Sequence, residues 1–179
     1  MQGLTGAKVF AMRGDDGVMR TGGKGQYLYK DHWTPCRVDR ALKDGDNVSL
    51  GNAVLTAHLT PGHTRGCTTW TMTATDNGTP EQVVIIGSPI VNSGYQLVNN
   101  RDYPEISDDF ARTFKVLKSL PCDIFLGAHG NYYGMESKYA KLASKNSPAN
   151  PFIDLEGYRA FVKDREKAYL DVLEKQQKR

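Results

Sequence analysis

The sequence predicts a mixed α/β fold, with strands in its middle part and helices in its last third. Three segments rich in β-branched and apolar residues, 54–59, 67–74 and 82–87, have the composition of buried strands. Apolar residues then recur at helical spacing from Phe110 to Leu120 and again after Asp154, which predicts two helices that each face a core. No repeat or linker interrupts the chain, so residues 1–179 are expected to form a single domain or part of one.

The first half is expected to begin with a strand at residues 7–12, followed by a glycine-rich stretch at 21–25. A phosphate-binding loop is not expected there, because no Gly-Lys-Ser or Gly-Lys-Thr follows at the required spacing. Short strands are predicted at 37–42 and 47–50, joined by a turn at 43–46.

The second half predicts a hairpin, because Asn77-Gly78 readily adopts the positive φ angles of a tight turn. The strand after this turn ends at Ser88, where a polar side chain is presented at a strand end. The remaining expected elements are a helix that starts at Ser107 with Asp108 and Asp109 in its first turn, a short buried strand at 122–126, a lysine-rich helix at 136–145, a last helix capped by Asp154, and a frayed end at 174–179.

Composition and charge exclude several classes of function. The chain has 179 residues, of which 39% are hydrophobic and 24% charged, as in ordinary globular proteins. Its net charge of +3 comes from scattered lysines and arginines, so no nucleic-acid partner is expected. We find no run that is apolar and long enough to cross a membrane, and no signal peptide. The three cysteines, Cys36, Cys67 and Cys122, match neither a zinc ribbon nor an obvious disulfide framework.

The four histidines, His32, His58, His63 and His129, are the first candidates for metal binding. His63 follows a strand and a Pro-Gly turn, and a rigid turn of this kind holds an imidazole in a fixed direction. A lone histidine beside a strand is more commonly a hydrogen-bonded structural residue. This structural role is expected for His58, which strand alternation directs elsewhere. Residue chemistry alone leaves both interpretations of His63 open.

Acidic residues have a simpler explanation. They lie in loops or at a helix start, where a solvated or capping role is expected. These residues are Asp15, Asp16, Asp102, Asp108 and Asp109.

Four segments together resemble the metallo-β-lactamase superfamily, in particular the third subclass of class B (zinc) β-lactamases. Residues 60–70, Thr-Pro-Gly-His-Thr-Arg-Gly-Cys-Thr-Thr-Trp, are similar to the third metal-ligand motif of that family. Residues 87–97, which begin Gly-Ser-Pro-Ile-Val-Asn, are similar to its substrate-binding loop. Residues 120–130, which end Gly-Ala-His-Gly, resemble the last ligand motif, and Asn-Pro-Phe-Ile-Asp at 150–154 resembles the C-terminal segment.

This resemblance implies hydrolysis of the β-lactam amide by a zinc-bound hydroxide. In the family, a pair of zinc ions lies at the edge of an αβ/βα sandwich, and zinc lowers the pKa of its bound water to about 7. The matched motifs imply that His63 is a ligand of the first zinc and His129 a ligand of the second. They also imply that Ser88 and Asn92 bind the carboxylate or carbonyl region of a β-lactam substrate, and that Tyr95 lines the cleft or helps to stabilise the oxyanion.

The loop at residues 22–33 has two possible roles. The family resemblance implies that Tyr27, Tyr29 and Trp33 form a wall of the substrate cleft. The simpler alternative is that these aromatic side chains are partly buried over the core.

The sequence departs from the family because none of its histidines forms the signature His-x-His-x-Asp-His. It therefore resembles an N-terminally truncated member: the C-terminal two-thirds of the sandwich, with most of the first sheet missing. Each zinc would retain one protein ligand, whereas a catalytic zinc takes about three ligands and a water. We therefore expect weak or absent zinc binding and hydrolysis by this chain. The uncovered sheet also predicts self-association.

Three explanations of the chain stay open. It is a fragment of an antibiotic-resistance β-lactamase, another metallo-hydrolase that acts on lactones or thioesters, or a non-catalytic remnant that binds a ligand or partner. Residues 88–95 and 150–154 favour a β-lactamase ancestor. The family resemblance also implies a periplasmic or secreted location.

Overall fold

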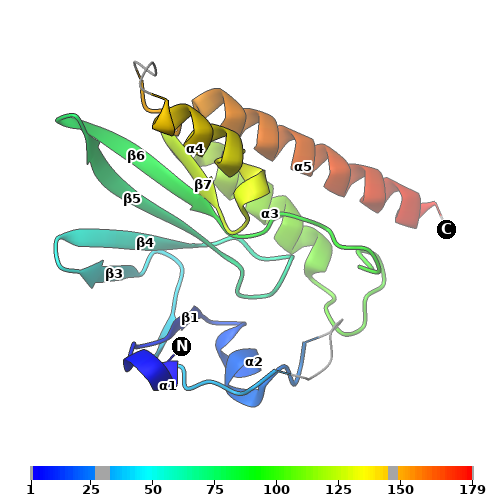
Figure 1. Cartoon of the computed structure of the whole chain (residues 1–179). Coiled ribbons are helices and arrows are strands. Elements are labelled where there is room, and N and C mark those ends of the chain that lie inside the picture. Colours follow the sequence, from blue (N-terminus) through cyan, green and yellow to red (C-terminus); the bar gives the residue numbers. More distant parts are fainter. Residues whose placement is uncertain (1, 27–32, 145–148, 179) are drawn as a thin grey trace.

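The computed structural model describes residues 2–26, 33–144 and 149–178, and Figure 1 shows how their elements are arranged. The helices are α1 (Gln2–Thr5), α2 (Asp16–Thr21), α3 (Ile106–Ser119), α4 (Met135–Ala143) and α5 (Leu155–Gln177), with a 3-10 turn η1 (Gly130–Tyr132). The strands are β1 (Phe10–Met12), β2 (Arg40–Leu42), β3 (Asn47–Leu50), β4 (Ala53–Leu59), β5 (Thr68–Asp76), β6 (Thr79–Ile86) and β7 (Ile124–Gly127). The prediction of an α/β fold is confirmed.

Five strands form one sheet in the order β3-β4-β5-β6-β7. Neighbours from β3 to β6 are antiparallel, whereas β7 lies parallel to β6 after a crossover through α3. The turn between β5 and β6 has positive φ at Asn77 (49°) and Gly78 (85°), which confirms the predicted hairpin. A two-stranded sheet pairs β1 with β2 in parallel.

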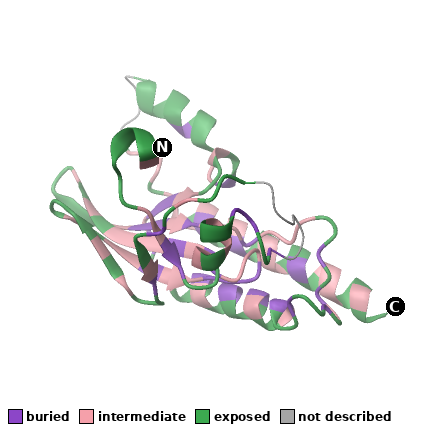
Figure 2. Cartoon of the chain, turned by 90° about the horizontal axis from the view of Figure 1, so that it is seen from below, coloured by how far each residue is buried: buried purple, intermediate pink, exposed green. Residues whose placement is uncertain are grey.

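One face of the five-stranded sheet packs against α3 and α5, as Figure 1 shows. Alternation along the strands directs Val84 and Ile86 of β6 to this face, together with Phe125 of β7. The helices contribute the buried side chains of Phe110, Phe114, Leu117, Tyr158, Val162 and Tyr169. This layer is the main hydrophobic core, and its buried residues gather where the sheet and the helices meet (Figure 2).

The opposite face of the sheet carries a smaller cluster. Ala57 of β4 packs there with Met12 of β1 and Leu42 of β2. Trp70 and Leu59, which contact the same cluster, are only half-buried. Self-association through this face stays a prediction.

The start of α3 differs from the expectation. Glu105 rather than Ser107 occupies the N-cap position, because the helix already begins at Ile106. The Ser107 hydroxyl lies inside the first turn, 3.2 Å from the Tyr169 hydroxyl, so the predicted capping role of Ser107 is wrong. The predicted cap of α5 is confirmed, because the Asp154 carboxylate accepts a hydrogen bond from the Gly157 N–H at 2.8 Å.

The C-terminal end of α5 is better held than expected. The helix continues to Gln177, so the prediction of a frayed end at 174–179 is wrong for the described residues. The Gln176 side chain accepts a hydrogen bond from the Leu97 N–H at 2.7 Å and donates one to the Tyr95 carbonyl at 2.7 Å. These two bonds tie the last turn of the helix to the loop after β6. No helix in the described part of the chain combines the length and apolar character needed to cross a membrane.

Candidate functional site

The turn that carries His63 connects β4 to β5. Its ends are joined by a hydrogen bond from the Thr60 N–H to the Cys67 carbonyl at 2.9 Å. Gly62 has a φ of 120°, and a Cβ atom at this position would lie 2.7 Å from the ring of Phe110. Only glycine therefore allows the turn to lie directly on helix α3.

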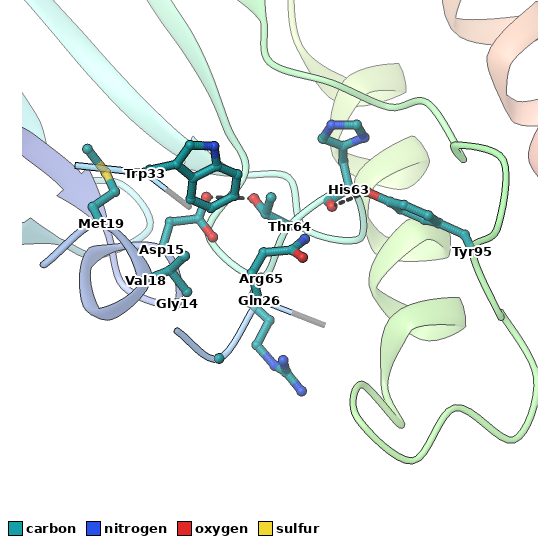
Figure 3. A pocket seen from close by; sticks show the side chains of 11 residues that line it. Gly14, Asp15, Val18, Met19, Gln26, Trp33, His63, Thr64, Arg65 and Tyr95 are labelled. Carbon is teal, nitrogen blue, oxygen red and sulfur yellow. Dashed lines mark hydrogen bonds between the residues drawn. The ribbon is translucent and has the colours of Figure 1, made fainter. Parts of the chain in front are cut away.

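Two side chains from other segments of the chain donate hydrogen bonds to the backbone of the same turn. The buried Thr113 hydroxyl of α3 donates to the Pro61 carbonyl at 2.6 Å. The Tyr95 hydroxyl donates to the His63 carbonyl at 2.8 Å, and the two rings lie 5.9 Å apart between centroids. Figure 3 shows the contact between Tyr95 and His63. The backbone of His63 is thus fixed by groups far from it in sequence.

The His63 ring has a defined direction as well. Its Nδ1 lies 2.9 Å from the Ile90 carbonyl oxygen, which can only accept a hydrogen bond. Nδ1 therefore carries a proton, and in the neutral ring Nε2 keeps its lone pair. Metal-binding histidines are commonly oriented by such a second hydrogen bond.

His129 follows β7 at the same end of the sheet as the His63 turn. Strands β6 and β7 are parallel and end side by side, with Ile86 opposite Gly127. Ser88 and His129 follow these two strand ends, and the Ser88 hydroxyl lies 3.3 Å from the Tyr132 hydroxyl. A cavity of about 400 Å³, which we call the histidine cavity, is lined by Ser88 and His129 together with His63. The structure therefore brings both predicted ligands and one predicted substrate-binding residue together.

A second cavity, of about 390 Å³, adjoins the histidine cavity, and we call it the tryptophan cavity. Trp33, His63 and Tyr95 line it, and Figure 3 shows these side chains. Trp33 is 52% exposed, so it forms a wall rather than part of the core. The other aromatic residues predicted for this wall, Tyr27 and Tyr29, lie outside the described residues, as does His32.

Two other candidates do not line either cavity within the described residues. Asn92, predicted to bind substrate, is half-buried, and its carbonyl accepts a hydrogen bond from the Tyr95 N–H at 3.1 Å. His58 lies on β4 with its Nε2 2.8 Å from the Thr71 hydroxyl. Burial lowers the pKa of His58, against the opposing charge of Asp44. This hydrogen-bonded position fits the structural role expected of His58.

Asp15 is the residue that the sequence placed wrongly. Its half-buried carboxylate makes no cap bond to its own helix and instead accepts hydrogen bonds from the Thr64 hydroxyl at 2.6 Å and the Gly66 N–H at 2.8 Å. Burial raises the pKa of Asp15, and these two hydrogen bonds oppose that shift. No local sequence signal indicates this role, because the partners lie 49 and 51 residues away.

The described residues do not form a complete zinc site. No group of three or more His, Cys, Asp or Glu side chains in that part of the chain lies close enough to hold a metal ion. Asp15 and Cys67 share the histidine cavity with the two imidazoles, but both Asp15 oxygens already accept hydrogen bonds. The Cys67 thiol is buried and already bonded to the backbone of Ser88, because its Sγ accepts from the Ser88 N–H at 3.2 Å and donates to the Ser88 carbonyl at 3.6 Å. Two imidazoles alone do not meet the usual requirement of about three protein ligands for a catalytic zinc.

A scan against models of known protein families finds no match. Solved structures, in contrast, match almost the whole chain. The native FEZ-1 metallo-β-lactamase from Legionella gormanii is 44% identical with a TM-score of 0.95, over 98% of this chain and 68% of that chain. BJP-1, a subclass B3 metallo-β-lactamase of Bradyrhizobium japonicum, is 34% identical with a TM-score of 0.87, over 98% and 66%. A metallo-β-lactamase from Cronobacter sakazakii is 32% identical with a TM-score of 0.90, over 99% and 67%.

These matches confirm the resemblance that the four sequence segments indicate. They also confirm the prediction of an incomplete metallo-β-lactamase sandwich, since the chain spans about two-thirds of the length of the matched structures. Identity of 44% over 98% of the residues is far above the level at which only the fold would be shared. The chain belongs to the metallo-β-lactamase family, and subclass B3 enzymes are among its relatives.

Proposed function

We propose that this chain is a polypeptide of a zinc-dependent β-lactamase, in which His63 and His129 serve as metal ligands and the adjoining cavities receive a β-lactam. The observation that carries this proposal is the convergence of His63, Ser88 and His129 on the histidine cavity from three separate segments. A class B3 metallo-β-lactamase from an Alaskan soil metagenome, described as a di-zinc enzyme, is 29% identical with a TM-score of 0.84. Among the described residues of this chain, the imidazoles of His63 and His129 are the groups that we assign as ligands of such ions.

The substrate would occupy both cavities. Ser88 is a hydroxyl-bearing residue of the histidine-cavity lining, and Trp33 offers an aromatic wall in the tryptophan cavity. Tyr95 would line the site rather than stabilise an oxyanion, because its hydroxyl hydrogen is directed to the His63 carbonyl. Asn92 would need to turn toward the substrate from its half-buried position. As in the family, the location would be periplasmic or secreted.

The proposal includes a low activity for the isolated chain. A catalytic zinc normally takes about three protein ligands, and the described residues supply two imidazoles between two sites. We therefore expect weak zinc binding and hydrolysis of a chromogenic β-lactam close to the uncatalysed rate.

Zinc affinity and β-lactam hydrolysis, measured on the same purified chain, test this proposal. Competition with a coloured chelator gives the affinity for wild type, His63→Ala, His129→Ala and the control His58→Gln. We expect the first two variants to bind zinc more weakly than wild type, and the control to be unchanged because His58 bonds to Thr71 outside the cavities.

Each other outcome contradicts a defined part of the proposal. Equal affinities in His63→Ala and His58→Gln would refute the assignment of His63 as a ligand. About two tightly held zinc ions per chain, with chelator-sensitive hydrolysis, would refute the low activity. Turnover of a lactone or thioester without turnover of a β-lactam would refute the substrate class.

A further inference from the structure

We propose that Asp15 is a positioning residue that clamps the His63 turn from the side opposite helix α3. This inference rests on the proposed role of His63 as a metal ligand, and it assigns to Asp15 a part in presenting that ligand. The argument uses the geometry of the carboxylate, the packing of the two backbones and the support beneath Asp15.

The Asp15 carboxylate binds two residues of the turn just after His63. Its Oδ2 accepts from the Thr64 hydroxyl at 2.6 Å, and its Oδ1 accepts from the Gly66 N–H at 2.8 Å. Figure 3 shows the contact between Asp15 and Thr64. Because one rigid carboxylate binds two points of the same turn, it fixes the turn's orientation as well as its distance.

The backbones at this contact are closely packed. A Cβ atom added at Gly66 would lie 2.6 Å from the Asp15 backbone nitrogen, so a glycine is required for this approach. Such packing leaves the turn little room to move relative to Asp15. The carboxylate therefore acts on a segment that is already in contact with its own backbone.

The Asp15 side chain does not make the capping hydrogen bond expected at its position. It is the N-cap residue of α2, where an aspartate side chain usually accepts a hydrogen bond from its own helix. Here the side chain makes no such bond and is directed to the His63 turn instead. The carboxylate therefore bonds to a turn that is distant in the sequence and makes no bond to the first turn of its own helix.

The support beneath Asp15 is buried. The preceding strand β1 pairs with β2, where Met12 lies opposite Leu42, and these side chains are 3% and 0% exposed. The Asp15 N–H donates to the Met12 carbonyl at 3.1 Å, and the Arg13 N–H donates to the Leu42 carbonyl at 2.9 Å. The carboxylate is therefore mounted on a fixed base, as a group that orients a ligand must be.

The turn is consequently held from two directions. Thr113 and Tyr95 bind the carbonyls of Pro61 and His63 from the helical side. Asp15 binds the other half of the turn from the N-terminal segment. Loss of the Asp15 clamp should free the half of the turn that follows His63 and loosen the Nδ1 contact with Ile90.

The test follows the histidine ring nitrogens by NMR in the full chain, with isotope-labelled histidine and at a pH where the rings are neutral. In wild type we expect His63 as a single tautomer with the proton on Nδ1. In Asp15→Ala we expect that tautomer to be lost from His63, while the signals of His58 and His129 do not move. Asp16→Ala is the matched control, because it removes the neighbouring carboxylate, which pairs with Arg20 at 3.8 Å on its own helix.

Asp15→Asn supplies a rescue. Its amide oxygen can still accept from the Gly66 N–H, and its amide nitrogen can donate to the Thr64 oxygen, so the wild-type His63 signal should return. A His63 signal unchanged in a folded Asp15→Ala chain would overturn the proposal. A perturbation of equal size in Asp15→Asn would also overturn it, because the effect would then follow the charge and not the two hydrogen bonds.

Thr64→Val covers the case in which Asp15→Ala does not fold. This variant removes one of the two hydrogen bonds, and we expect a smaller change of the His63 signal in the same direction. An unchanged His63 signal in Thr64→Val would overturn the clamp. Since the readout needs neither zinc nor substrate, failure of the clamp would leave His63 as a ligand, and failure of the zinc test would leave the clamp intact.

Discussion

Thr113→Val tests how strongly helix α3 holds the His63 turn. Thr113 is 1% exposed, and its hydroxyl donates to the Pro61 carbonyl at 2.6 Å. Valine has nearly the same shape but no donor, so the variant removes one hydrogen bond and leaves a buried carbonyl unpaired. Loss of a buried partner costs about 2 kcal/mol. For a chain of this length, that corresponds to a fall in Tm of about 4–8 °C.

Thermal unfolding followed by circular dichroism measures this effect. Thr75→Val is the matched control, because Thr75 is an exposed residue of β5, and a surface change of this kind should alter stability by no more than about 0.5 kcal/mol. If Thr113→Val unfolds at the same temperature as the control, the Pro61 carbonyl finds another partner. The hydrogen bond from α3 would then not be what holds the turn.

Two further predictions concern the turn backbone and the thiols. Gly62→Ala should lower the Tm by more than Gly78→Ala, because both residues have positive φ but only the Cβ at Gly62 meets a ring, at 2.7 Å, whereas the Cβ at Gly78 meets nothing within 4 Å. Equal shifts in calorimetry would mean that the helix yields to the added methyl. Burial raises the pKa of Cys67 to about 11 and of Cys122 to about 12, so alkylation of the folded chain near pH 8 should modify the half-buried Cys36 first. Mass spectrometry that finds Cys67 modified as fast as Cys36 would contradict this.

Much of the fold follows from local sequence patterns. The hairpin at Asn77-Gly78 was predictable because those two residues tolerate positive φ angles. Both residues have positive φ in the structure. The cap at Asp154 was predictable for a similar reason, because an aspartate before an apolar helical pattern bonds the first turn. In both cases the determining contact joins residues no more than a few positions apart.

The features that sequence patterns missed depend on contacts between distant segments. A frayed end was predicted for α5 because its last residues are polar, yet Gln176 bonds to Leu97 and Tyr95 about 80 residues away. Asp15 was assigned to solvent or a cap for the same reason, since its partners Thr64 and Gly66 are visible only in the folded chain. Short-range propensity contains no information on such pairs.

The family motifs predicted which residues belong to the candidate site. The structure shows why these residues, which are distant in the sequence, lie around one cavity. His129 and Ser88 follow parallel strands that end together, while His63 lies in a turn held by α3 and by Asp15. None of these supports involves a metal ion, because they are hydrogen bonds and packing within the protein. The imidazole of His63 is directed by the Ile90 carbonyl, 2.9 Å from its Nδ1. If His63 binds zinc as proposed, little free energy would be spent on bringing its ring into place, and the zinc affinity would depend mainly on the number of ligands available.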